Sequence, residues 1–97
     1  MHLRPIAVLF VAAAAPAVAA DRPPETVYRH VCGYCHGVNV GPAIRGRALE
    51  PDATRYIVRH GQNAMPAFRP TEITESELKA LSLWLQASKA DPKEHGQ

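Results

Sequence analysis

The sequence predicts a small all-α domain of three or four short helices joined by long loops. Apolar residues recur at helical spacing in three stretches, and no stretch shows the alternation of apolar and polar residues that is typical of a strand. Glycine and proline concentrate between these stretches, where they favour loops. With 97 residues the chain has room for one domain, and a core this small needs additional stabilisation.

Proline and glycine delimit the first two helices. The first begins near residues 23–24 and is short, because Cys32 already starts a different pattern. The second is predicted over residues 51–60, since Pro51 suits a first turn and Gly61 suits a C-terminal end. The segments that follow these helices, residues 37–47 and 62–71, are rich in glycine or proline and are predicted as loops.

The third helix has the clearest start in the chain. Thr74 and Glu77 fit a capping box, in which each side chain bonds the backbone N–H of the other residue. An apolar stripe follows over two turns: Leu78, Leu81, Trp84 and Leu85. Residues 89–97 are polar, and we expect this tail to be frayed.

Residues 1–20 differ from the rest of the chain. Arg4 is followed by an apolar run over residues 6–15 and by small residues up to Ala20, which is the pattern of a secretory signal peptide. The run is too short to span a bilayer, although an uncleaved anchor is the alternative. Cleavage after Ala19 or Ala20 fits this pattern, and Ala20 is favoured. We then expect a domain over residues 21–97, export to the periplasm and no stable membrane insertion after cleavage.

The charge balance excludes one class of function. After loss of Arg4 the chain carries ten Lys and Arg residues against nine Asp and Glu residues, and the basic residues are scattered. Nucleic-acid binding normally requires a concentrated basic surface, so we do not expect it here.

The strongest motif is Cys32-Gly33-Tyr34-Cys35-His36. A Cys-x-x-Cys-His sequence is the attachment signature of c-type haem. Two thiols at this spacing can reach the two vinyl groups of the porphyrin, and the histidine that follows serves as an axial iron ligand. The sequence thus predicts one covalently bound haem c, which would also fill the small core.

Three alternatives are weighed for the two cysteines. A redox dithiol of the thioredoxin type needs a βαβ setting that the pattern lacks. A zinc site would use His36 and a further ligand such as His60, and a structural disulfide would join Cys32 to Cys35. None of these explains the long apolar loops as well as a haem does.

Met65 is the favoured sixth ligand of the iron. It is the one methionine that remains after leader removal, and Pro66 fixes the backbone beside it. Thioether ligation raises the reduction potential, which suits an electron carrier. His60 is the rival ligand, and a core role for Met65 is the structural alternative.

These motifs resemble class I cytochromes c of the small bacterial type. The resemblance rests on residues 32–36, on Gly41-Pro42 and on Met65-Pro66, and it covers nearly the whole chain after residue 20. It implies a few helices around one haem, a Pro42 carbonyl that accepts the Nδ1–H of His36, and packing of the first helix on Trp84 and Leu85. The family often has a glycine in its first helix, where this chain has prolines.

A closer resemblance is to the cytochrome subunits of 4-cresol dehydrogenase (p-cresol methylhydroxylase) and of related alkylphenol and eugenol hydroxylases. It rests on residues 31–36, 41–47, 57–61 and 64–68. It implies an electron-transfer subunit without substrate chemistry of its own. Its partner would be a FAD-containing flavoprotein dehydrogenase, and its acceptor a soluble blue-copper protein or another cytochrome. The alternatives are a free periplasmic cytochrome that serves a respiratory oxidase or reductase, and a haem enzyme or gas sensor.

Other residues are candidates for lesser roles. Arg47 ends the predicted haem-wrapping loop, and either a haem propionate or a partner protein would suit its charge. Ala64, Pro66 and Ala67 form a small uncharged surface beside Met65, which would suit either a docking patch or the pocket wall. We expect Tyr56 and Trp84 to be core residues.

Overall fold

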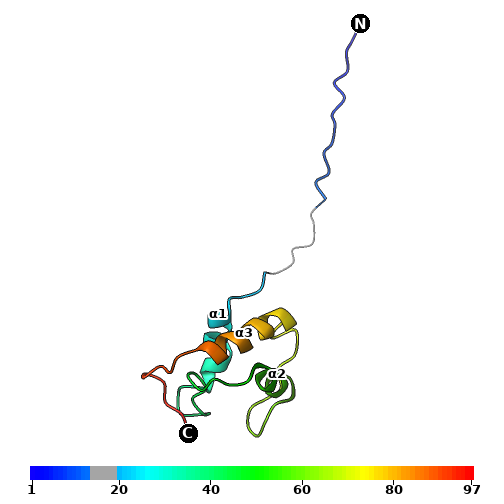
Figure 1. Cartoon of the computed structure of the whole chain (residues 1–97). Coiled ribbons are helices and arrows are strands. Elements are labelled where there is room, and N and C mark those ends of the chain that lie inside the picture. Colours follow the sequence, from blue (N-terminus) through cyan, green and yellow to red (C-terminus); the bar gives the residue numbers. More distant parts are fainter. Residues whose placement is uncertain (14–19) are drawn as a thin grey trace.

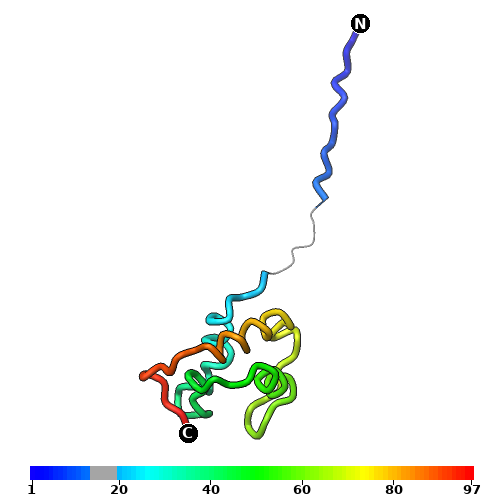
Figure 2. The backbone as a smooth tube through the Cα atoms, in the orientation of Figure 1, coloured from blue at the N-terminus to red at the C-terminus, as the bar shows by residue number. Residues whose placement is uncertain are grey.

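The computed structural model describes residues 1–13 and 20–97. In these ranges it has four helical elements and no β-strand: α1 (Pro24–His30), the 3-10 turn η1 (Cys32–Tyr34), α2 (Pro51–His60) and α3 (Glu75–Ala87). α3 contacts both α1 and α2, and the chain between α2 and α3 makes a wide loop (Figures 1 and 2). The prediction of a small all-α fold is confirmed.

Residues 1–13 have no regular secondary structure and are exposed outside the helical domain (Figure 1). The predicted leader, residues 1–20, falls partly on residues 14–19, which lie outside the described residues. Within the described ranges, no helix is both long enough and apolar enough to cross a membrane.

The core forms where α1 and α2 pack against α3. Val27 of α1 and Leu78 of α3 have no exposed surface, and Val58 is the buried residue of α2. The rings of Tyr28 and Trp84 lie 5.2 Å apart between centroids, so the first and last helices make the expected contact. α1 spans only seven residues, as its prolines predict.

Tyr56 is not a core residue, contrary to the sequence prediction. Its side chain is 64% exposed and stacks on the His60 ring at 4.0 Å. The apolar spacing on α2 suggests an inward face through Tyr56, but the helix is turned so that Val58 points into the core. An aromatic pair one helical turn apart covers its own apolar surface, so it does not require a tertiary partner.

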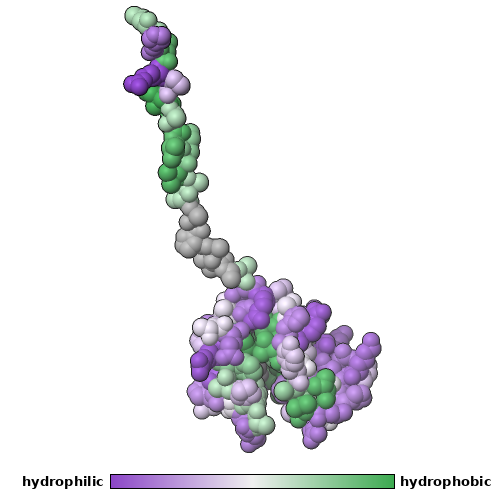
Figure 3. All heavy atoms as spheres, turned by 180° about the vertical axis from the view of Figure 1, so that it is seen from behind, coloured by the Kyte–Doolittle hydropathy of each residue, from purple (hydrophilic) through white to green (hydrophobic). Residues whose placement is uncertain are grey.

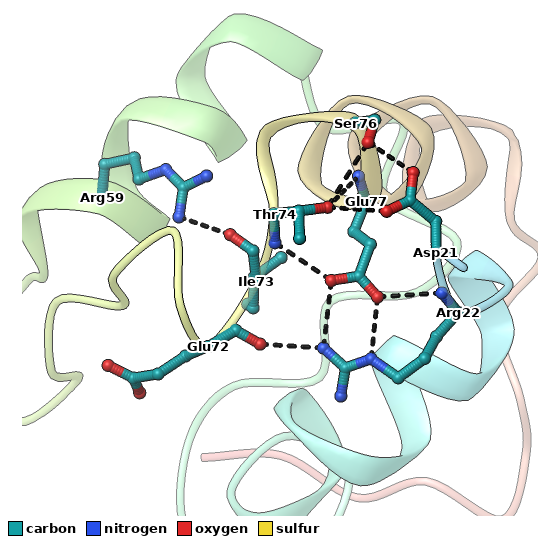
Figure 4. Close-up of polar contacts among 8 residues, drawn as sticks. All are labelled: Asp21, Arg22, Arg59, Glu72, Ile73, Thr74, Ser76 and Glu77. Carbon is teal, nitrogen blue, oxygen red and sulfur yellow. Dashed lines mark hydrogen bonds and ion pairs between the residues drawn. The ribbon is translucent and has the colours of Figure 1, made fainter. Parts of the chain in front are cut away.

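The predicted capping box at the start of α3 is present. The Thr74 hydroxyl accepts from the Glu77 backbone N–H at 3.1 Å, and Oε1 of Glu77 accepts from the Thr74 N–H at 3.0 Å. The other carboxylate oxygen of Glu77 accepts from the backbone N–H and the Nε of Arg22, at 2.9 and 2.8 Å (Figure 4). The Arg22 guanidinium lowers the pKa of Glu77 to about 2.

Asp21 strengthens the same junction. Its carboxylate accepts from the Thr74 hydroxyl at 3.0 Å and from the Ser76 hydroxyl (Figure 4). Both hydroxyls lie at the N-terminus of α3, where a negative charge is favourable to the helix dipole. The first residues of the domain are therefore fastened to α3 by polar contacts.

The tail over residues 89–97 is docked, which corrects the expectation that it frays. His95 forms an isolated bridge with Val38, through backbone bonds of 3.0 Å to Gly37 and Asn39. The Tyr28 hydroxyl donates to the Glu94 carboxylate at 2.9 Å. The polarity of the tail predicts exposure correctly, but it does not reveal these long-range partners.

Candidate functional site

A cavity of about 520 Å³ lies inside the domain, within the size range of small-molecule and cofactor sites. Its walls come from η1, the loop after it, α2, the loop after α2, and α3. Hydrophobic residues gather around a hollow between more polar flanks (Figure 3). The sequence-predicted site residues that line the cavity are Cys32, Cys35, His36, Pro42, Arg47, Ala64, Met65 and Pro66.

The η1 turn brings both thiols and the imidazole to one cavity. The backbone N–H groups of Cys35 and His36 both donate to the Cys32 carbonyl, at 3.1 and 2.9 Å. Both cysteines are free thiols, and the structure therefore has no disulfide between Cys32 and Cys35. Burial raises the pKa of the Cys32 thiol to about 11, whereas a redox-active dithiol needs a lowered thiol pKa.

The zinc alternative also lacks its ligands. Among the described residues, no group of three or more His, Cys, Asp or Glu side chains is close enough to hold a metal ion. His60, the proposed extra ligand, is exposed and does not line the cavity. Its Nδ1 lies 2.8 Å from the carbonyl oxygen of Tyr56, on the outside of α2.

His36 is held by the loop that follows it. Its Nδ1 lies 2.7 Å from the Pro42 carbonyl oxygen. Because a carbonyl oxygen only accepts, Nδ1 carries the hydrogen and Nε2 keeps its lone pair for a metal. Gly41 eases this approach, since a Cβ atom there would make a tight contact of 3.3 Å with two atoms of the His36 ring.

Met65 lies in a tight turn at the end of α2. Gln62 and Met65 exchange backbone hydrogen bonds of 3.0 and 2.9 Å. Gly61 has φ +77° and ψ 167°, a conformation that is essentially restricted to glycine, and a Cβ atom there would lie 2.8 Å from the Met65 carbonyl oxygen. The Met65 side chain is half-buried and packs against the hydrophobic core.

The three arginines around the site have different surroundings. Arg47 is exposed at the cavity, and its Nη1 donates to the Ala43 carbonyl at 3.3 Å. Arg45 lies over the Trp84 ring at 5.3 Å and pairs with tail carboxylates. Arg59 donates to backbone carbonyls of the loop before α3. Arg47 is thus the arginine of the three that borders the cavity.

Sequence reasoning missed two cavity residues, Ile73 and Leu49. Ile73 is 1% exposed and lines the cavity together with Ile44, Leu49, Phe68, Leu81 and Leu85. The sequence does contain a signal for Ile73. An apolar residue just before the N-cap often packs against the fourth residue of the helix, an arrangement called a hydrophobic staple. Ile73 precedes the Thr74 cap, Leu78 is the fourth residue of α3, and both belong to the core cluster.

The residues present fit a covalently attached haem. Two uncommitted thiols, an imidazole with a free Nε2 and a thioether border one apolar cavity. This site within a small all-α fold defines the class of protein as a c-type cytochrome. The chain belongs to the family described as cytochrome c oxidase, cbb3-type, subunit III, whose sequence profile matches residues 19–85. As a c-type cytochrome it is an electron-transfer protein.

The chain is also similar to a curated cytochrome c subunit and to chains of two solved structures. The chain is 37% identical over 65 residues to the cytochrome c subunit of 4-cresol dehydrogenase (hydroxylating) from Pseudomonas putida. The match covers 65% of this chain and 58% of that relative. A chain in the crystal structure of p-cresol methylhydroxylase with substrate bound is 36% identical, with a TM-score of 0.65 over 69% of this chain and 93% of that chain. A second structure of p-cresol methylhydroxylase gives a TM-score of 0.63 at the same identity, over 67% and 92%.

Proposed function

We propose that this chain is a single-haem cytochrome c that accepts electrons one at a time from a flavoprotein. The observation that carries the proposal is the convergence of Cys32, Cys35, His36 and Met65 on one apolar cavity. Cys32 and Cys35 would hold the porphyrin, since each thiol can add to a vinyl group without a leaving group. His36 and Met65 would hold the iron, and the bound haem would supply the one-electron redox centre.

The surrounding residues hold these donors in place. The Pro42 carbonyl fixes the His36 ring and makes Nε2 more basic, as partners of metal-bound histidines generally do. The apolar walls exclude water and leave few polar groups to compete for the iron. Arg47 borders the cavity and is proposed to neutralise a haem propionate.

The relatives support a flavocytochrome role. The p-cresol methylhydroxylase chain is matched over nearly its whole length, and the matched curated relative is a cytochrome c subunit. We therefore infer a FAD-containing dehydrogenase of para-alkylphenols as the electron donor, with the exposed Ala64, Pro66 and Ala67 as the docking patch. The electrons pass on to a soluble acceptor, a blue-copper protein or another cytochrome, and the leader motif supports a periplasmic location.

The family description favours one alternative. A cbb3-type oxidase subunit belongs to respiration, which supports a free or oxidase-linked cytochrome instead of a flavoprotein subunit. A haem enzyme or gas sensor needs an open iron position, and the presence of Met65 in the cavity wall argues against it.

Two experiments test the proposal. Carbon monoxide should bind the reduced holoprotein slowly at neutral pH, because Met65 occupies the sixth position; rapid binding would refute that ligand set. A tagged holoprotein should co-purify with a FAD-containing partner and be reduced when an alkylphenol is added. Reduction by a respiratory reductase alone would assign the chain to the alternative role.

A further inference from the structure

Arg59 stands out because it holds the loop that carries Met65 without touching the cavity. It lies in the last turn of α2, and its side chain is 17% exposed. Its Nη1 donates to the Ile73 carbonyl at 2.8 Å, a contact visible in Figure 4, and to the Phe68 carbonyl at 3.3 Å. One guanidinium nitrogen therefore joins two points of the chain between Met65 and α3.

The two carbonyls belong to cavity residues. Phe68 and Ile73 both line the cavity, and the Phe68 backbone N–H donates to the Val58 carbonyl at 2.8 Å. Residues 62–73 contain no helix or strand, and the bond from Phe68 is the backbone hydrogen bond that joins them to the rest of the domain. Hydrogen bonds to a charged donor are stronger than bonds between neutral groups, which makes Arg59 a major tie of this loop.

Since the loop places Met65, we propose that Arg59 is the positioning residue for the Met65 thioether. This inference rests on the proposed role of Met65 as an axial ligand. Arg59 acts through the Phe68 and Ile73 carbonyls, which keep the loop closed over the cavity. When these bonds are lost, the loop opens more often and leaves the sixth iron position to other ligands.

The neighbouring Arg55 provides a matched control. Arg55 and Arg59 both pair with Glu75, at 3.0 and 3.3 Å, and both lie on α2. Arg55 has no hydrogen bond to the loop carbonyls; its other partner is Asp52. Loss of Arg55 therefore removes an arginine–Glu75 pair from the same helix and leaves the ties of the Met65 loop intact.

The test measures how readily imidazole displaces Met65 in the oxidised holoprotein, together with the sulfur–iron absorption band. We expect Arg59→Met to raise the apparent imidazole affinity about tenfold, because charge-assisted hydrogen bonds are lost. Arg55→Met should change it by less than about twofold, as for other exposed ion pairs. Arg59→Lys keeps the charge and can reach one carbonyl, so an intermediate affinity is expected, and this variant decides the matter if Arg59→Met yields no holoprotein.

The outcomes separate the two proposals. An unchanged imidazole affinity in Arg59→Met, with only a lower unfolding temperature, would make Arg59 a structural residue and overturn the inference. If Arg59→Met yields no holoprotein, a wild-type affinity in Arg59→Lys overturns it equally. A wild-type protein without a sulfur–iron band would instead refute Met65 as the ligand, and with it the proposed ligand set.

Discussion

The His36 side and the Met65 side of the cavity are held by different means. The His36 ring is hydrogen-bonded to the Pro42 carbonyl, only six residues away in the sequence. The Cys32 carbonyl accepts hydrogen bonds from two backbone N–H groups within the same short segment. Met65 lies in a loop whose carbonyls accept hydrogen bonds from Arg59 on α2 and from Arg22 before α1. The hydrogen bond that orients His36 is thus local in sequence, whereas the loop around Met65 also depends on distant side chains, and we expect the methionine side to yield first.

The most direct way to break this asymmetry is Met65→Ala. We expect complete loss of the sulfur–iron absorption band and a reduction potential lower by roughly 0.1–0.3 V, within the range of about 0.8 V that axial ligands control. Spectroscopy and potentiometry on the holoprotein check this. A spectrum and potential that Met65→Ala leaves unchanged would transfer the ligand role to another group, and His60→Ala would then test the histidine alternative.

Gly61→Ala tests the turn that carries Met65. A Cβ atom at Gly61 would lie 2.8 Å from the Met65 carbonyl oxygen, and the backbone conformation is disfavoured for alanine. We expect a loss of stability of about 2–3 kcal/mol and a weakened sulfur–iron band. Gly33→Ala is the control, since its added Cβ meets nothing closer than 3.5 Å and should be almost neutral. Equal effects of the two substitutions on the band would contradict the asymmetry.

Low pH should destabilise the fold through Glu77, which holds Arg22, a donor to the Glu72 carbonyl of the Met65 loop. The pKa of Glu77 is lowered to about 2 by Arg22, from an ordinary value of 4.5. The carboxylate therefore contributes its full stability above about pH 4.5, and this contribution disappears as the pH falls toward 2. Because Arg22 is 39% exposed, we discount the contribution to about 2 kcal/mol.

Denaturant unfolding as a function of pH measures the Glu77 contribution. Glu77→Gln should be less stable than the wild type at pH 7, and the difference should shrink below pH 4. Glu25→Gln, which changes an exposed carboxylate on α1, should follow the wild-type curve. A constant difference between Glu77→Gln and the wild type from pH 7 to pH 2 would show that the ion pair is not the cause.

The smallest expected effect is on the histidine side. The Tyr28 hydroxyl bonds Glu94 of the docked tail, and Arg45 also contacts that carboxylate at 3.8 Å. Tyr28→Phe should cost about 1 kcal/mol of stability, because Arg45 still neutralises Glu94. The sulfur–iron band should not change. A change in the band, seen in the holoprotein spectrum, would mean that the two sides of the cavity are coupled.

Local signals in the sequence predicted local structure well. The range of α2, the Thr74–Glu77 capping box and the grouping of Cys32, Cys35 and His36 all depend on residues within a few positions of one another. The docked tail and the loop contacts of Arg59 were not foreseen. A polar residue looks the same in sequence whether it faces solvent or a carbonyl far along the chain, so such partners emerge only from the fold.

The contact between His36 and Pro42 has a consequence for the speed of electron transfer. Proline fixes its own φ angle, which restricts the backbone that carries the carbonyl bonded to His36. The Nδ1–H group of His36, held by this carbonyl, moves little when the charge of a neighbouring redox centre changes by one unit. Fixed dipoles of this kind need little rearrangement during the reaction. Under the proposed function, the rate would then depend on how often and how closely the partner docks, and much less on any motion within this domain.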